Sequence, residues 1–186
     1  MKKAAILLMV ALTFMGCSRE HREMEEALHF RSALLQAQGC SFQTEITADY
    51  GEVLYEFSMD CRADRHGTVS FSVTGPETIA GITGTVSETK GELTFDDTAL
   101  QFELMAEGTL SPVSAPWLLI RTLRSGCITS VCEEGGMLRL SVDDSYADDA
   151  LRLDIWVDEE NRVTRAEVLQ QGVRILTLRV ASFQLL

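Results

Sequence analysis

Hydrophobic residues recur at every second position over most of this chain, and no other feature constrains its fold as strongly. The pattern starts with five residues on one side of a run: Cys40, Phe42, Thr44, Ile46 and Ala48. After a break over residues 49–52, it resumes with Val53, Tyr55, Phe57, Met59 and Cys61. Successive side chains of a β-strand point to opposite faces of the sheet. Two such runs around a short break predict an antiparallel β-hairpin.

The alternation also predicts how the two strands of this hairpin pair. We expect a two-residue loop at residues 50–51, which places Phe42 opposite Met59. The same register places Cys40 opposite Cys61. A shift by one residue would turn one strand's apolar side chains to the wrong face. Opposed residues in a non-hydrogen-bonded pair are close enough for a disulfide. We therefore expect a Cys40–Cys61 disulfide; two buried free thiols are the alternative, since cysteine often serves as a small core residue.

Alternating runs continue to the end of the chain, at residues 69–73, 93–104, 138–142, 151–157, 163–169 and 173–183. Two segments follow a helical period instead. Residues 19–38 place apolar side chains at steps of three and four, namely Met24, Ala27, Leu28, Leu34 and Leu35. Residues 114–124 are apolar on nearly all sides and end before Gly126.

These elements predict an α+β fold that is mainly antiparallel β. Successive hairpins in one domain favour a strongly curved sheet or open barrel. We expect an N-terminal helix in front of it and one inserted apolar helix. A helix without a polar face is usually buried.

The first seventeen residues read as a targeting segment. Two lysines precede an apolar stretch at residues 4–14, which is typical of a secretory signal peptide. The stretch is too short to span a bilayer. Gly16-Cys17 resembles the lipobox of bacterial lipoproteins, whose cysteine carries a diacylglyceryl group. The resemblance implies a signal peptide at 1–16, a single anchored domain at 17–186, and an extracytoplasmic, membrane-attached protein. An ordinary secreted protein is the alternative.

The net charge of the chain excludes some classes of binding partner. The chain has 28 acidic and 16 basic residues and a net charge of −12. Nucleic acid binding requires basic residues that neutralise phosphates, so we expect none. The acid excess also disfavours attraction to anionic lipid headgroups. Contact with a membrane should therefore depend on acylation of Cys17.

No motif indicates catalysis, a cofactor or a metal. The three histidines, His21, His29 and His66, lack the spacing of a zinc site. The carboxylates at residues 143–149 lack the glycine and terminal glutamate of a calcium-binding EF-hand loop. Cys127 and Cys132 form a second candidate disulfide, which would require a turn between them. We expect a protein that is not an enzyme and has no cofactor.

The order of elements is similar to the LolA/LolB-like lipoprotein carrier superfamily. The similarity lies in a leading helix, the 40–61 hairpin, the strand end at residues 71–77, the turn at 93–97 and the apolar helix at 116–123. It implies a curved sheet around a cavity that holds an apolar ligand such as a lipid or lipopeptide. Candidates for lining this cavity are Phe42, Tyr55, Phe57, Phe71, Phe102, Trp117 and Ile120. The apolar helix would act as a movable lid; filling the sheet as core is the alternative.

A second class of function fits the same residues. The chain could be a structural, sensor or protein-interaction module of the cell envelope with a packed interior. An exposed apolar patch or sheet edge would favour that function, whereas an internal cavity would favour ligand binding.

Overall fold

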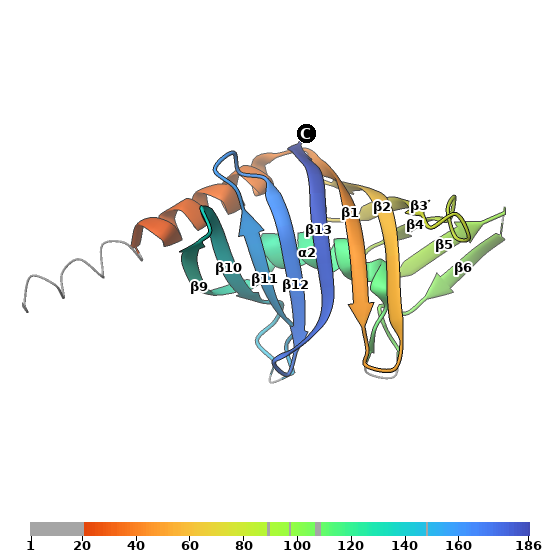
Figure 1. The fold of residues 1–186 in the computed structure, drawn as a ribbon. Coiled ribbons are helices and arrows are strands. Elements are labelled where there is room, and N and C mark those ends of the chain that lie inside the picture. Colours follow the sequence, from red (N-terminus) through yellow and green to blue (C-terminus); the bar gives the residue numbers. More distant parts are fainter. Residues whose placement is uncertain (1–20, 89, 97, 107–108, 148) are drawn as a thin grey trace, which may run out of the picture.

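The computed structural model describes residues 21–88, 90–96, 98–106, 109–147 and 149–186. Within these residues, eleven strands form one antiparallel sheet in the order β6-β5-β4-β3-β2-β1-β13-β12-β11-β10-β9 (Figure 1). The sheet curves but does not close, so β6 and β9 are its two edges. Two further short strands, β7 (Met105–Ala106) and β8 (Thr109–Leu110), pair with each other.

The strands of the sheet have these bounds: β1 Gly39–Asp49, β2 Leu54–Asp64, β3 Val69–Gly75, β4 Thr83–Val86, β5 Gly91–Phe95, β6 Thr98–Phe102, β9 Cys127–Glu134, β10 Met137–Asp143, β11 Arg152–Val157, β12 Val163–Gln170 and β13 Val173–Leu185. All of them except β4 and β9 fall on the predicted alternating runs. Most neighbours in the sheet are consecutive in sequence, as expected for hairpins. The exception is β1, which pairs with the last strand, β13. This pairing joins the two halves of the meander into one sheet.

The register of the first hairpin differs from the prediction by two residues. Phe42 lies opposite Cys61, and Cys40 lies opposite Ala63. The loop spans residues 50–53, and the Tyr50 N–H donates to the Val53 carbonyl over 3.1 Å. A shift of two keeps every side chain on its predicted face, so polarity alone could not detect it.

The expected Cys40–Cys61 disulfide is therefore wrong. Both cysteines are buried free thiols, offset along their strands instead of facing each other. Burial raises the pKa of the Cys40 thiol to about 12 and raises that of Cys61 as well. Cys127 and Cys132 are also free, and both lie in the single strand β9. Five residues of strand separate two Cα atoms by about 16 Å, far beyond disulfide reach.

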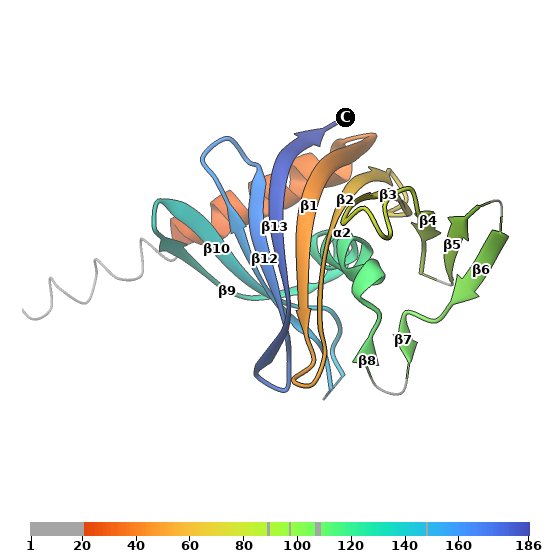
Figure 2. The same cartoon turned by 45° about the vertical axis from the view of Figure 1, so that its right-hand side comes forward.

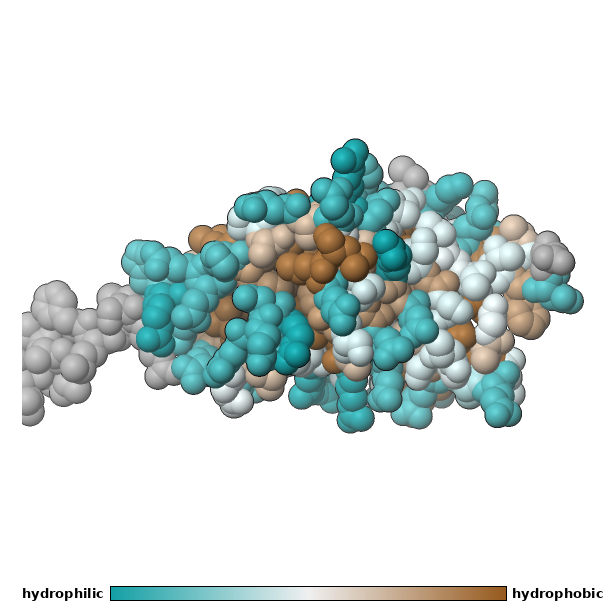
Figure 3. All heavy atoms as spheres, turned by 90° about the horizontal axis from the view of Figure 1, so that it is seen from above, coloured by the Kyte–Doolittle hydropathy of each residue, from teal (hydrophilic) through white to brown (hydrophobic). Residues whose placement is uncertain are grey.

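The N-terminal helix (residues 21–36) lies on the concave side of the sheet (Figures 1 and 2). Ala27, Phe30 and Leu34 form its buried face. Leu28 and Leu35, which the helical pattern assigns to that face, are about half exposed. Seen from above, apolar side chains reach the surface near the middle of the molecule (Figure 3). No helix in the described residues is long and apolar enough to cross a membrane.

Helix α2 (Ala115–Ser125) fills the hollow of the sheet (Figure 2). It follows a short 3-10 turn, η1 (Pro112–Ser114), and its apolar residues are buried on all sides. Leu119 is fully buried. Arg121, Arg124 and Ser125 form its one polar side, and the rest of its surface is covered, as expected for an inserted helix that serves as core.

The outer face of β10–β12 buries one tryptophan under charged side chains. The guanidinium carbons of Arg139 and Arg165 lie 5.4 and 4.8 Å from the centre of the Trp156 ring. Asp154, which is buried, accepts hydrogen bonds from Arg139 and from the Ser141 hydroxyl, each over 2.6 Å. Stems of arginine side chains cover apolar surface while their heads stay solvated, so this face needs no second layer.

Candidate functional site: an apolar cavity

The concave face is not filled along its whole length. Between β2, β3, β5, β6 and η1 lies an apolar pocket of about 550 Å³ that is open to solvent on one side; we call it the cavity. That volume is within the range of about 300–1,000 Å³ that is typical of small-molecule sites. Its wall is mostly apolar, and the lining residues are Tyr50, Tyr55, Phe57, Val73, Ile79, Ile82, Leu93, Phe102, Glu103, Leu110, Ser111, Pro112 and Val113. Helix α2 fills the hollow beside this region, so the cavity is the part of the concave face that α2 leaves uncovered.

Strand register brings these side chains together. Alternate residues of β2 point inward, which places Tyr55 and Phe57 on the concave face next to the core residue Met59. Across the sheet, Leu93 of β5 pairs with Leu100 of β6, and their neighbours on the same face include Phe102. The cavity wall is thus the continuation of the core face onto the outer strands.

Two strand glycines make room for aromatic rings, one in the cavity wall and one in the core beside it. A Cβ at Gly91 would lie 2.4 Å from Cζ of Phe102, and one at Gly84 would lie 2.5 Å from Cζ of Phe71. Real Cβ atoms do not approach so closely, so each ring lies directly over a glycine. A glycine in a strand often marks such a close approach. The absence of a side chain at Gly91 therefore lets the Phe102 ring approach β5, and Phe102 borders the cavity.

One polar group of the wall, the Tyr50 hydroxyl, has a partner within the protein. The Tyr50 hydroxyl donates a hydrogen bond to the Leu110 carbonyl, and the Tyr50 and Tyr55 rings meet edge to face at 6.3 Å. Burial raises the pKa of Tyr50 to about 12, so its hydroxyl stays neutral at physiological pH. Glu103 is the one charged residue among the described lining residues. That lining includes no histidine, cysteine, lysine or arginine. The wall is therefore suited to apolar contact.

Three of the seven sequence candidates line the cavity: Tyr55, Phe57 and Phe102. Phe42, Phe71 and Ile120 lie in the core, at most 5% exposed. Trp117 is 6% exposed and lies beside the Arg121 guanidinium, 5.4 Å from ring centre to Cζ. Cys17, the predicted lipid attachment site, lies outside the described residues.

Several lining residues were missed from the sequence. Tyr50 was assigned to the turn, and Ile79 and Ile82 lie in the irregular segment between β3 and β4. Pro112 and Val113 precede α2. None of them belongs to an alternating run, so the period-two pattern carried no signal for them. Their apolar character, in segments expected to be loops, was the available hint.

Acidic side chains gather elsewhere. A second hollow, of about 450 Å³, lies between the N-terminal helix and the turns after β9 and β11, and its lining includes Glu26, Glu133 and Asp158. The described residues contain no group of His, Cys, Asp or Glu placed to hold a metal ion. In the predicted carboxylate loop, Asp143 pairs with Arg152 and Asp144 with Arg121, while residue 148 lies outside the described residues.

Comparison with known proteins gives likeness only at the level of solved structures. No family model matches the sequence, and no curated protein matches it. An uncharacterized conserved protein from Thermus thermophilus is similar with a TM-score of 0.49 and 10% identity, over 88% of this chain and 87% of that one. A LolA superfamily protein from Nitrosomonas europaea gives 0.47 and 7%, over 87% and 93%. The Mycobacterium tuberculosis lipoprotein LppX gives 0.42 and 12%, over 87% and 93%.

Proposed function

We propose that this protein is an extracytoplasmic lipoprotein that binds an apolar ligand, such as the acyl chains of a lipid or lipopeptide, in the cavity beside α2. The observation that carries the proposal is the cavity of about 550 Å³, walled by apolar side chains on the face where the rest of the sheet is closely filled. An unfilled hollow of this kind leaves apolar surface in contact with water. Contact between apolar surface and water is unfavourable, and a ligand that covers this surface removes the unfavourable free energy.

The chemistry of the wall selects the ligand. Each methylene group that leaves water contributes about 0.8 kcal/mol, so an acyl chain could supply the affinity without any strong polar contact. Glu103 and the chain's net charge of −12 oppose an anionic group inside the cavity. A neutral ligand, or one whose headgroup stays outside, fits best.

The proposal is for binding without catalysis. The Tyr50 hydroxyl, a polar group of the wall, is engaged by the Leu110 carbonyl. Proton transfer to a bound molecule would need a side chain whose pKa lies near the working pH, within reach of the reacting atom. The described lining supplies hydroxyls and one carboxylate, a set suited to holding a ligand in place.

Attachment to the membrane forms the second part of the proposal. Diacylation of Cys17 would hold the domain at the outer side of a membrane. An acidic surface would keep the domain itself off an anionic bilayer. Anchoring and ligand binding are separable, since Cys17 is not among the described residues that line the cavity.

One experiment tests both parts. We expect intact mass spectrometry of the full chain from a lipoprotein-processing bacterium to show a diacylglyceryl mass at Cys17. Native mass spectrometry should show one further lipid. Ile79→Trp fills the cavity from its irregular wall and should lower ligand occupancy about tenfold, which corresponds to about 1.4 kcal/mol.

The matched control is Val173→Trp, on the exposed β12–β13 turn, which should retain the ligand. An anchor mass without any co-purifying lipid in the native chain would refute the binding proposal. Equal occupancy in the two variants would refute the cavity as its site. An unmodified Cys17 would refute the anchor alone.

A further inference from the structure

The β5–β6 hairpin carries an apolar face that extends beyond the cavity. Leu93 of β5 lies opposite Leu100 of β6. Phe95 follows Leu93 by two residues on β5, and Phe102 follows Leu100 by two residues on β6, so all four lie on the same face. Leu93 and Phe102 line the cavity, whereas Leu100 and Phe95 are 62% and 54% exposed. The core face of the sheet thus continues onto a hairpin where nothing in the described residues covers it.

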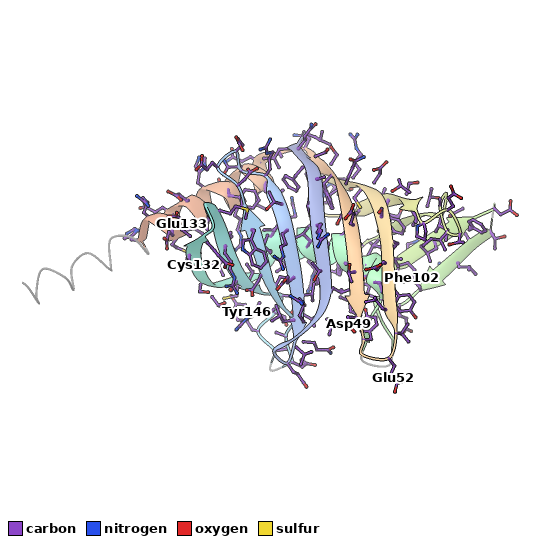
Figure 4. All side chains as sticks on the ribbon, viewed as in Figure 1. Asp49, Glu52, Phe102, Cys132, Glu133 and Tyr146 are labelled. Atoms are coloured by element: carbon purple, nitrogen blue, oxygen red, sulfur yellow. The ribbon has the colours of Figure 1, made fainter. Side chains whose placement is uncertain are left out.

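Strand β6 is also an edge strand of the sheet, and it lacks the features that usually protect such edges. It pairs with β5 on one side only and lies at the right-hand border of the molecule, with no described strand beyond it (Figure 2). Its five residues, Thr-Ala-Leu-Gln-Phe, include no charge and no proline. Edge strands in soluble proteins are commonly protected by charged side chains, proline or bulges. The opposite edge, β9, ends on two glutamates and carries Glu133 at the far side of the sheet from Phe102 (Figure 4).

Charge around this edge indicates what could cover it. Residues 88–107 contain six acidic side chains and one lysine. A second copy of the chain would bring the same acidic residues against them, and such like-charge contacts disfavour association. The acidic side chains would attract a basic partner, whereas they would repel a second copy of the chain.

We propose that β6 accepts an extended segment of a protein partner as an additional strand, and that this segment alternates apolar with lysine or arginine residues. Backbone hydrogen bonds to the free edge would provide affinity, and alternate side chains would provide specificity. The proposal goes beyond ligand binding in the cavity and does not depend on it.

The two faces of the hairpin match that alternation. Apolar residues of the added strand would lie beside Leu100 and Phe102 on the concave face. Its basic residues would lie on the outer face, where Gln101 is opposed to Glu92. Cross-strand neighbours of opposite charge stabilise a sheet, and neighbours of like charge destabilise it.

The test uses a fluorescent peptide of alternating valine and lysine and the full-length chain in phosphatidylcholine nanodiscs, with empty nanodiscs as the background. We expect saturable binding that weakens as salt rises. Amides of residues 98–102 should gain protection from hydrogen exchange. An alternating valine–glutamate peptide should bind at least about tenfold more weakly.

Leu100→Lys places a positive charge on the edge and should weaken binding of the lysine peptide about tenfold. The matched control is Val173→Lys, which changes the charge equally at a site that is 65% exposed and distant in the sheet order. Circular dichroism should show that both variants keep the fold.

Three results would overturn the proposal. One is equal binding of the lysine peptide to both variants. Another is protection of amides elsewhere while residues 98–102 stay unprotected. The third is a wild-type dimer that Leu100→Lys dissociates and that excludes the peptide, which would assign the edge to a second copy. The cavity variant Ile79→Trp should bind the peptide normally, so failure here leaves the ligand proposal intact.

Discussion

Individual glycines decide where aromatic rings can lie in this protein. Gly91 and Gly84 are strand residues, and a side chain at either would collide with a phenylalanine ring on a neighbouring strand. Glycine normally weakens a strand. Here it allows a ring to pack against the strand, which a residue with a side chain would prevent.

Gly91→Ala should destabilise the protein by about 1–3 kcal/mol, because the new methyl group would displace Phe102 from its place over β5. Urea denaturation should show the loss as a lower midpoint. Gly75→Ala is the matched control: its added Cβ would lie 3.9 Å from the Ser58 hydroxyl, an ordinary contact. Equal stability of the two variants would mean that Phe102 moves freely.

The buried thiols make a second prediction at this scale. We expect Cys40 and Cys61 to resist iodoacetamide in the folded protein at about pH 8, since burial raises the pKa of both above its ordinary value. Cys132, which is exposed, should react. Tryptic mapping with mass spectrometry distinguishes them, and a peptide that links Cys40 to Cys61 would contradict the observed register.

The raised pKa values of Cys40 and Cys61 also predict how the free energy of unfolding changes with pH. A thiol whose pKa is higher in the folded state than in the unfolded state holds its proton more tightly when folded. Its contribution is complete below the unfolded pKa. It is lost as pH rises toward the folded value, which is about 12 for Cys40. The free energy of unfolding should therefore decline above about pH 9.

At the scale of elements, α2 acts as core. Leu119 and Ile120 are almost completely buried, and Trp117 is buried as well. The sequence left open whether this helix is a lid or a core element, and the burial of its apolar residues favours core. A charged residue in place of Trp117 would therefore disturb the packing of the molecule and would not test a lid.

Leu119→Ala should lower stability by about 2–5 kcal/mol, since it leaves a cavity where the sheet closes around α2. Thermal and urea unfolding would measure the loss. Leu100→Ala, at an exposed position of β6, should change stability by less than about 0.5 kcal/mol. Similar losses in both variants would contradict the role of α2 as core.

At the scale of the whole molecule, the pairing of β1 with β13 determines the overall architecture. It places the N-terminal hairpin beside the C-terminal one and leaves β6 and β9 at opposite edges. The edges differ in character: β9 ends on carboxylates, whereas β6 is uncharged. The cavity and the open edge both belong to the β2–β6 half, so the two proposed interactions would take place at the same end.

From the alternating runs, the sequence predicted most of the antiparallel strands and the apolar helix before Gly126, but it did not predict β4 and β9. Local period is sufficient for this, because alternation at two residues and recurrence at three to four residues reflect backbone geometry. It missed the exposure of Leu28 and Leu35, since a helix's sequence does not say which of its apolar residues will meet a neighbour.

Strand register, the pairing of β1 with β13 and the boundary between core and cavity depend on contacts between distant parts of the chain. A two-residue shift leaves the alternation unchanged, so the turn at residues 50–53 had to settle the partners of Cys40 and Cys61. Phe42 and Phe57 both point inward, yet only Phe57 borders the cavity. The reason is that α2 covers one part of the concave face and leaves another part open. The periodicity of the sequence does not indicate how far along the sheet α2 extends.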